Sequence, residues 1–218
     1  MADSTLDELK QLVLGFNMDR AEEVATKAIE EGEDPLDCAN ALTDGIREIG
    51  DKFGTGELFL PDLVCASEVV KNALPVITKE IESRGGTRQT LGRVVIGTVF
   101  GDIHSIGKSM VSTLLFASGF EVIDLGINVK SDAFLHAVKQ HDADILAMSA
   151  LLTTTMMEQK HVIEGLKTQQ MRDRVKVLVG GSPINKEFAE SIGADGYGPT
   201  APEGVKVAKR LLGIEEKK

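Results

Sequence analysis

The chain has 218 residues, of which 42% are hydrophobic and 27% charged, so it can bury one large or two small globular cores. Its formal net charge of −10 repels phosphate backbones and argues against a nucleic-acid partner. The start MADSTLDELKQL lacks the features of a secretory signal, and no apolar run approaches the roughly 18 residues of a membrane span. We therefore expect a cytoplasmic protein without a membrane partner.

Residues 1–84 show apolar side chains at helical spacing and no β-branched run. Ser4 and the Asp34-Pro35 pair are typical of helix starts. Pro75 is expected to kink or split the last helix. Short links between the helices predict a small four-helix bundle. The predicted helices lie in the stretches 4–16, 19–32, 34–56 and 59–86.

Residues 85–92 are polar and glycine-rich, and they are the predicted linker to a second domain at 93–218. In that domain, apolar β-branched runs alternate strictly with helical stretches. This alternation predicts an α/β doubly wound fold, Rossmann- or flavodoxin-like, with a five-stranded parallel sheet. The predicted strands are 93–100, 121–126, 144–151, 175–181 and 195–198, and the helices are 105–119, 131–142, 156–168, 185–193 and 201–213.

Three polar loops follow predicted strands: GDIHSIG, SALLTTT and GGSP. In sheets of this kind, ligands bind at the carboxyl ends of the strands near a switch point. The loops should therefore meet at one edge and form a binding site there.

The loop GDIHSIGKSM ends in Gly-Lys-Ser, as a phosphate-binding loop does. Such a loop needs four residues between its first glycine and the Gly-Lys pair, whereas five separate Gly101 from Gly107. The extra residue argues against nucleotide hydrolysis, because the backbone N–H groups must close around a phosphate of fixed size.

Asp102 and His104 stand two residues apart, so on an extended loop their side chains can meet. A carboxylate on one ring nitrogen fixes the tautomer and leaves the other nitrogen as a metal ligand. The same pair would suit a general base. A third interpretation is that Asp102 and Ser105 only cap the next helix. The residue types alone do not decide between these three interpretations, a metal ligand, a general base and a helix cap.

The pattern D-x-H-x-x-G, then S-x-L, then G-G resembles the signature of cobalamin-binding domains in methyltransferases and mutases. The helical stretch GIREIGDKFGTGELFLPDL resembles the bundle that caps the upper face of the corrin in methyl-carrying corrinoid proteins. Together the resemblance covers about residues 15–213. The matching positions are Asp102, His104, Gly107, Ser149, Leu151, Gly180 and Gly181.

The resemblance implies that cobalamin binds base-off and His-on, with its nucleotide tail inside the sheet domain. His104 is then the ligand of the cobalt, and Asp102 holds its other nitrogen. A hydroxyl in the run from Thr153 to Thr155 would extend this relay, and Thr155 fits the family spacing best. Ser105 stands where many relatives have aspartate.

The tail pocket is implied in the same way. Ser149 and Leu151 would line it, Gly107 would allow a close approach of the tail, and Gly180 with Gly181 would give it room. The cofactor-binding residues that the resemblance implies are Asp102, His104, Ser105, Ile106, Gly107, Ser149, Leu151, Thr153, Gly180 and Gly181.

The family's function is to carry a methyl group, as methylcobalamin, between a substrate:corrinoid methyltransferase and an acceptor methyltransferase. A reductive activation protein is the third partner that the resemblance implies. One alternative is the cobalamin subunit of an adenosylcobalamin-dependent mutase, and another is a cobalamin-based sensor. The chain lacks the roughly 250 residues of a barrel methyltransferase, so it is not expected to activate a substrate alone.

Overall fold

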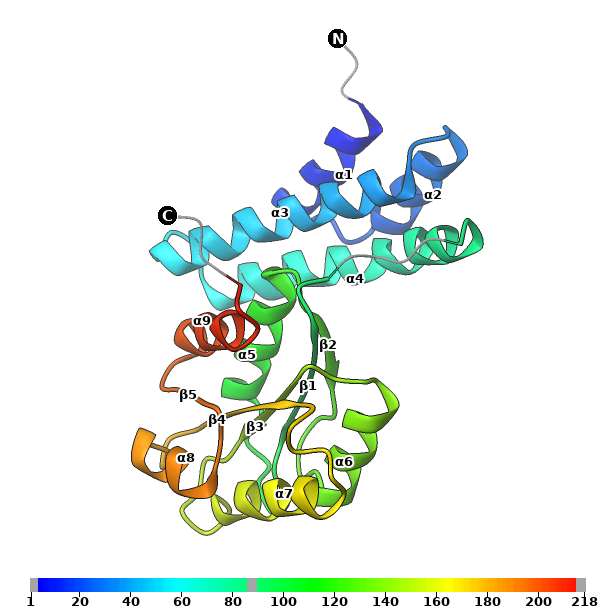
Figure 1. Ribbon diagram of the computed structural model, residues 1–218. Coiled ribbons are helices and arrows are strands. Elements are labelled where there is room, and N and C mark those ends of the chain that lie inside the picture. The colour runs from blue at the N-terminus through cyan, green and yellow to red at the C-terminus, as the bar shows by residue number, and fades with distance from the viewer. Residues whose placement is uncertain (1–3, 86–89, 215–218) are drawn as a thin grey trace. The chain divides into compact units, whose positions relative to one another are not determined.

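A computed structural model describes residues 4–85 and 90–214 of the chain (Figure 1). The chain divides into two compact units, one of Met1–Gln89 with Ala117–Gly119, the other of Thr90–Phe116 with Phe120–Lys218. Residues 86–89 of the predicted linker lie outside the described residues. Within the described ranges, no helix is both long and apolar enough to cross a membrane.

The first unit contains a bundle of four helices, as predicted, in its described part. The Ser4 hydroxyl accepts a hydrogen bond from the Asp7 N–H, and the Asp34 carboxylate accepts one from the Leu36 N–H, so both residues cap helices. Helix α3 packs along α4, while α1 packs on α3 and α2 on α4. The helices are α1 Thr5–Leu14, α2 Ala21–Glu30, α3 Pro35–Thr55 and α4 Leu60–Ser83.

Helix α4 continues through Pro75, so the predicted split at this proline is wrong. Pro75 lies on the exposed face of α4, whereas Ala73 and Ile77 on either side are buried. The carbonyl that loses its N–H donor at the proline therefore faces water, which can replace the bond. Burial of the opposite face keeps the helix continuous.

The second unit is a five-stranded parallel sheet with the strand order β2-β1-β3-β4-β5. This confirms the predicted fold class. The order reverses between β1 and β3, which is the switch point of a flavodoxin-like sheet. The strands are β1 Arg93–Thr98, β2 Glu121–Asp124, β3 Ile145–Ser149, β4 Lys176–Gly180 and β5 Gly196–Gly198.

Helices cover both faces of this sheet. In Figure 1, α6 and α7 lie on one side of it, and α5 and α9 lie on the other. Residues of α8 join α6 and α7 in the buried core of the first face. The helices are α5 Ile106–Ala117, α6 Ser131–Gln140, α7 Met157–Thr168, α8 Lys186–Ile192 and α9 Ala201–Leu211.

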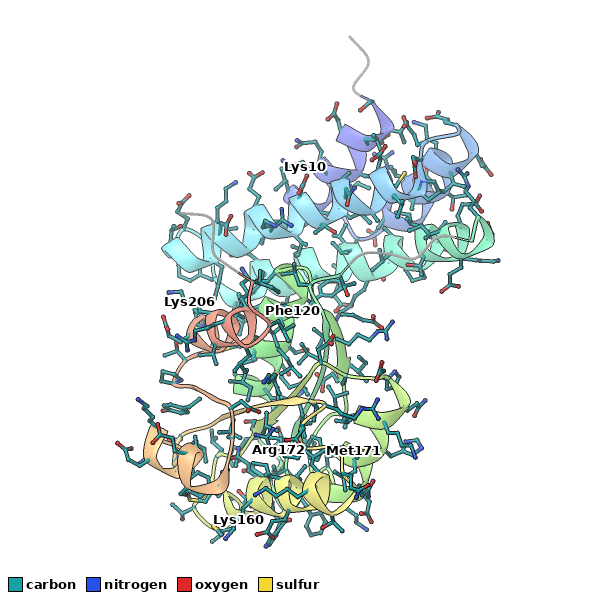
Figure 2. The ribbon with its side chains drawn as sticks, in the orientation of Figure 1. Lys10, Phe120, Lys160, Met171, Arg172 and Lys206 are labelled. Atoms are coloured by element: carbon teal, nitrogen blue, oxygen red, sulfur yellow. The ribbon has the colours of Figure 1, made fainter. Side chains whose placement is uncertain are left out.

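The core on the α6 and α7 face is continuous and aliphatic. Phe134 of α6, Ile163 of α7 and Leu146 of β3 are fully buried in it. Met171 and Arg172, labelled side by side in Figure 2, follow α7. Met171 joins this core, whereas the Arg172 guanidinium pairs with the Asp195 carboxylate at 2.9 Å. This pair ties the connections before β4 and β5 together, at the amino ends of those strands.

Candidate functional site

The turn after β1 contains a buried carboxylate that accepts four hydrogen bonds. Asp102 has no exposed surface. Its Oδ1 accepts from the His104 N–H at 3.0 Å and lies 2.7 Å from His104 Nδ1. Its Oδ2 accepts from the Leu151 N–H at 2.7 Å and from the Thr155 hydroxyl at 2.9 Å. The predicted meeting of Asp102 with His104 and Thr155 is thus present, and Leu151 contributes its backbone.

These hydrogen bonds hold Asp102 in its ionised form. Burial raises the pKa of the Asp102 carboxyl, but the bonds from Leu151, His104 and Thr155 outweigh it and lower the pKa to about 2. An ionised carboxylate at Nδ1 places a proton on that nitrogen and leaves the lone pair of Nε2 available. The interpretation of Asp102 as a helix cap does not hold, because its carboxylate bonds to the turn and to the loop after β3.

The depressed pKa of Asp102 predicts a specific acid sensitivity. Because the folded-state pKa lies below its ordinary value of 3.8, the ionised carboxylate stabilises the fold above that value. This contribution, about 2 kcal/mol, is lost as the pH falls from about 4 to about 2. In urea unfolding of the apoprotein, Asp102→Asn should show a correspondingly flatter pH dependence over this range. Parallel curves for the two proteins would contradict the prediction.

His104 is half-exposed, and exposed apolar side chains surround it in the sequence. Its side chain is 46% exposed. Ile103 and Ile106 are more than 70% exposed, and Leu151 is 37% exposed. Water solvates large aliphatic side chains poorly, so three exposed ones on the two segments that Asp102 joins indicate a surface that a largely apolar ligand covers.

A cavity of about 570 Å³ lies on the α5 and α9 side of the sheet. It arises from small residues that the strand register brings into one row. Ser149 pairs with Thr98 and Gly180, and Gly180 pairs with Gly198. Ala147 stands in the next row on the same face. Because these residues have little or no side chain, the sheet and the two helices leave an open space between them.

Most of the predicted cofactor residues lie at this cavity or at the Asp102 network. Ser149 lines the cavity and is only partly buried. Ser105, Ile106 and Thr153 are exposed and do not line the cavity. The predicted residues that line it are Gly107, Ser149, Leu151, Gly180 and Gly181.

Two glycines at the end of β4, Gly180 and Gly181, also pack closely against neighbouring backbone. Gly181 has a φ of +127°, and a Cβ there would lie 1.8 Å from the Ala150 carbonyl oxygen. A Cβ on Gly180 would lie 3.1 Å from the Gly198 carbonyl oxygen. Close packing of backbone against backbone therefore requires glycine at position 181, and at position 180 it leaves little room for a side chain.

Lys108 also lines the cavity, and the sequence analysis did not identify it. This residue is only 5% exposed, and its Nζ donates to Oδ2 of Asp124 at the end of β2. The Gly-Lys-Ser run by itself indicates only a phosphate loop. Its lysine could have been matched with Asp124, because Lys108 lies in the first turn of the helix after β1 and Asp124 ends the adjacent strand β2.

The pair of Lys108 and Asp124 predicts an asymmetric effect of mutation. Asp124→Asn keeps the acceptor for the Gly126 N–H but leaves a buried ammonium group without its counter-charge. We expect Asp124→Asn to lower the free energy of unfolding by about 2 kcal/mol. Breaking a fully buried pair costs about 3–5 kcal/mol, and the cost is smaller here because Asp124 is 34% exposed. Lys108→Met fills the same space and should cost less than half as much. Urea unfolding measures both variants, and equal losses would contradict this account.

Two family models match the chain, and both are described as a B12 binding domain. One covers residues 92–206 and the other covers residues 5–78. The trimethylamine corrinoid protein of Methanosarcina barkeri is 42% identical over 213 residues, which are 97% of this chain and 98% of that protein. The dimethylamine corrinoid protein of the same organism is 40% identical over 210 residues, 96% of this chain and 98% of that protein.

A solved structure is also similar over nearly the whole chain. It is the crystal structure of the methanol:cobalamin methyltransferase complex of Methanosarcina barkeri. One of its chains is 29% identical to this one, with a TM-score of 0.86, over 99% of this chain and 82% of that chain. The sequence and the fold therefore point to the same group of proteins.

Proposed function

Because this chain belongs to the family of cobalamin-binding corrinoid proteins, we propose that it carries a methyl group between two methyltransferases. In this proposal the cofactor binds base-off, and His104 is the lower ligand of the cobalt. The similarity to trimethylamine and dimethylamine corrinoid proteins supports the methyl-carrier role.

The residues at the carboxyl edge of the sheet fit a corrinoid. The cavity of about 570 Å³ has the size and the apolar wall that the nucleotide arm of a cobamide needs. The Ser149 hydroxyl offers a hydrogen bond to a ring nitrogen of that arm. The exposed Ile103, Ile106 and Leu151 offer an apolar surface to the corrin.

The observation that carries the proposal is the hydrogen bond of 2.7 Å between Asp102 and His104 Nδ1. It fixes the tautomer in which Nε2 has a free lone pair, on a side chain that is half-exposed. A carboxylate behind the histidine is the usual second partner of a metal-binding imidazole. A histidine serving only to stabilise the fold would not need to keep its side chain half-exposed.

Each polar group at the site then has a task that does not depend on the cofactor's own chemistry. Asp102 holds a proton on Nδ1 and keeps the imidazole ring in one orientation. The Leu151 N–H and the Thr155 hydroxyl keep Asp102 ionised. The bound corrinoid supplies the metal that accepts and releases the methyl group.

Three partners follow from this role: a substrate-specific methyltransferase, an acceptor methyltransferase and a reductive activation protein. The complex between a corrinoid protein and a methyltransferase in the similar solved structure supports the first. For residues 1–84, the proposed role is to shield the bound cofactor. Phe59, directly before α4, is 71% exposed, so its ring is available to a ligand.

The test is anaerobic reconstitution of the full chain with cobalamin, followed by incubation with a panel of candidate methyltransferases and their methyl donors. Methyl transfer is followed by the absorbance of the methylated cofactor, and the alkyl group is identified after photolysis. A methyl group that appears only with one methyltransferase and its donor supports the carrier role. An adenosyl group, or failure to take up cobalamin, would overturn it.

A further inference from the structure

The loop between β2 and α6 contacts the turn that carries Asp102 and His104. The Asn128 N–H donates to the Asp102 carbonyl oxygen at 3.0 Å, and Asn128 Oδ1 accepts from the Gly101 N–H at 2.8 Å. One residue of the neighbouring loop thus binds the backbone on both sides of the peptide bond between Gly101 and Asp102. Neither bond involves the carboxylate.

Asn128 has the backbone conformation that this arrangement requires. Its φ is 55°, in the left-handed region, where asparagine is several-fold enriched over other side chains. The next residue, Val129, is held in register, because its N–H donates to the Thr98 carbonyl at 3.0 Å. The loop therefore presents both hydrogen-bonding groups of Asn128 from a fixed position.

Thr98 holds the other end of the same turn. Its hydroxyl donates to the His104 carbonyl oxygen at 2.9 Å. Residues 101–104 are thus fixed by Asn128 at the start and by Thr98 at the end, while the Asp102 carboxylate binds the imidazole. Asp102 and His104 can keep their short contact only while the backbone of this turn stays in place.

We infer that Asn128 is a positioning residue for the imidazole of His104. It acts through the backbone of Gly101 and Asp102 and touches neither the ring nor the cofactor. This inference rests on the proposed function only in that His104 is taken as the ligand of the cobalt. Asn128 lies outside the three motifs of the resemblance, and it extends the site to a loop that follows a different strand.

The test compares variants that separate the two properties of Asn128. Asn128→Asp keeps an acceptor for the Gly101 N–H and tolerates the left-handed backbone. Asn128→Gly keeps the backbone freedom but loses the acceptor, and Asn128→Ala loses both. Asn185→Ala is the matched control, because Asn185 Oδ1 likewise accepts one backbone hydrogen bond, from Phe188 at the start of α8.

The first readout is the His104 Nδ1 proton in the apoprotein, observed by NMR. Its exchange with water should be about tenfold faster in Asn128→Gly than in wild type, and faster still in Asn128→Ala. Asn128→Asp and Asn185→Ala should leave it unchanged, although Asn185→Ala lowers the unfolding temperature. If the Nδ1 proton of Asn128→Gly exchanged at the same rate as that of the wild type, the inference would be overturned.

The second readout is the fraction of histidine-bound cobalt in the reconstituted protein, taken from the absorption spectrum. It should fall in Asn128→Gly and be restored in Asn128→Asp. If the wild-type protein binds cobalamin without His104, the proposed function fails, and the proton exchange in the apoprotein still decides the role of Asn128. If the wild type is histidine-bound and Asn128→Gly matches it in both readouts, the inference fails alone.

Discussion

The His104→Ala protein is expected to retain some cobalamin but to show an altered absorption spectrum and greatly reduced methyl transfer. Removal of the carboxylate partner of a metal-binding histidine typically costs about 10- to 100-fold in affinity or activity. Removal of the imidazole itself should cost more than this, because Asp102 cannot take its place. Anaerobic titration with cobalamin and single-turnover methyl transfer measure the two effects.

His161→Ala is the control for this experiment. His161 is also exposed, and its Nδ1 also faces a carboxylate, that of Glu158 at 3.1 Å. Its pair lies on the surface of α7 and does not belong to the Asp102 network. The spectrum of the control should equal that of the wild type. A wild-type spectrum for His104→Ala would show that His104 is not the ligand.

The Gly181→Ala protein is expected to lose at least about 3 kcal/mol of stability, because its Cβ would overlap the Ala150 carbonyl oxygen. The positive φ of Gly181 adds strain that no rearrangement of side chains can relieve. The loss should appear in thermal and urea unfolding of the apoprotein, before any cofactor is added.

Gly107→Ala should behave in the opposite way. A Cβ there meets no protein atom within 4 Å, and Gly107 lies in the first turn of α5. Alanine should therefore stabilise the apoprotein by up to about 1 kcal/mol. If the nucleotide arm occupies the cavity that Gly107 lines, the added methyl group should weaken cobalamin binding about tenfold or more. Unchanged binding would exclude the arm from this part of the cavity.

The order and type of the elements could be predicted because each depends on a local pattern. The apolar runs that form β1, β3 and β4 lie between helical stretches. This alternation of strands and helices predicts a parallel sheet. The predicted strands extended one or two residues beyond those of the structure, for example to Phe100 where β1 ends at Thr98. Apolar residues continue into the loops, so the pattern alone does not mark the end of a strand.

The hydrogen-bond network and the cavity were only partly predictable. Asp102 and His104 are neighbours in the sequence, so their contact follows from spacing. The cavity depends on the register that aligns Ser149, Gly180 and Gly198 from three different strands. That register depends on both strands and on the connection between them, so the pattern of one strand alone does not give it. The contribution of Asn128 was missed because its bonds to Gly101 and Asp102 join two loops that the sequence pattern does not place in contact.

The four bonds to Asp102 also bear on the order in which the protein acquires its site during folding. Its Oδ2 partners, Leu151 and Thr155, are 49 and 53 positions away along the chain and follow β3. The carboxylate can lose its water only after β3 has paired with β1, because an unpaired buried charge is too costly. A chain in which β3 has not paired with β1 therefore holds the His104 imidazole in a loose turn, so the ordered site forms only after that pairing.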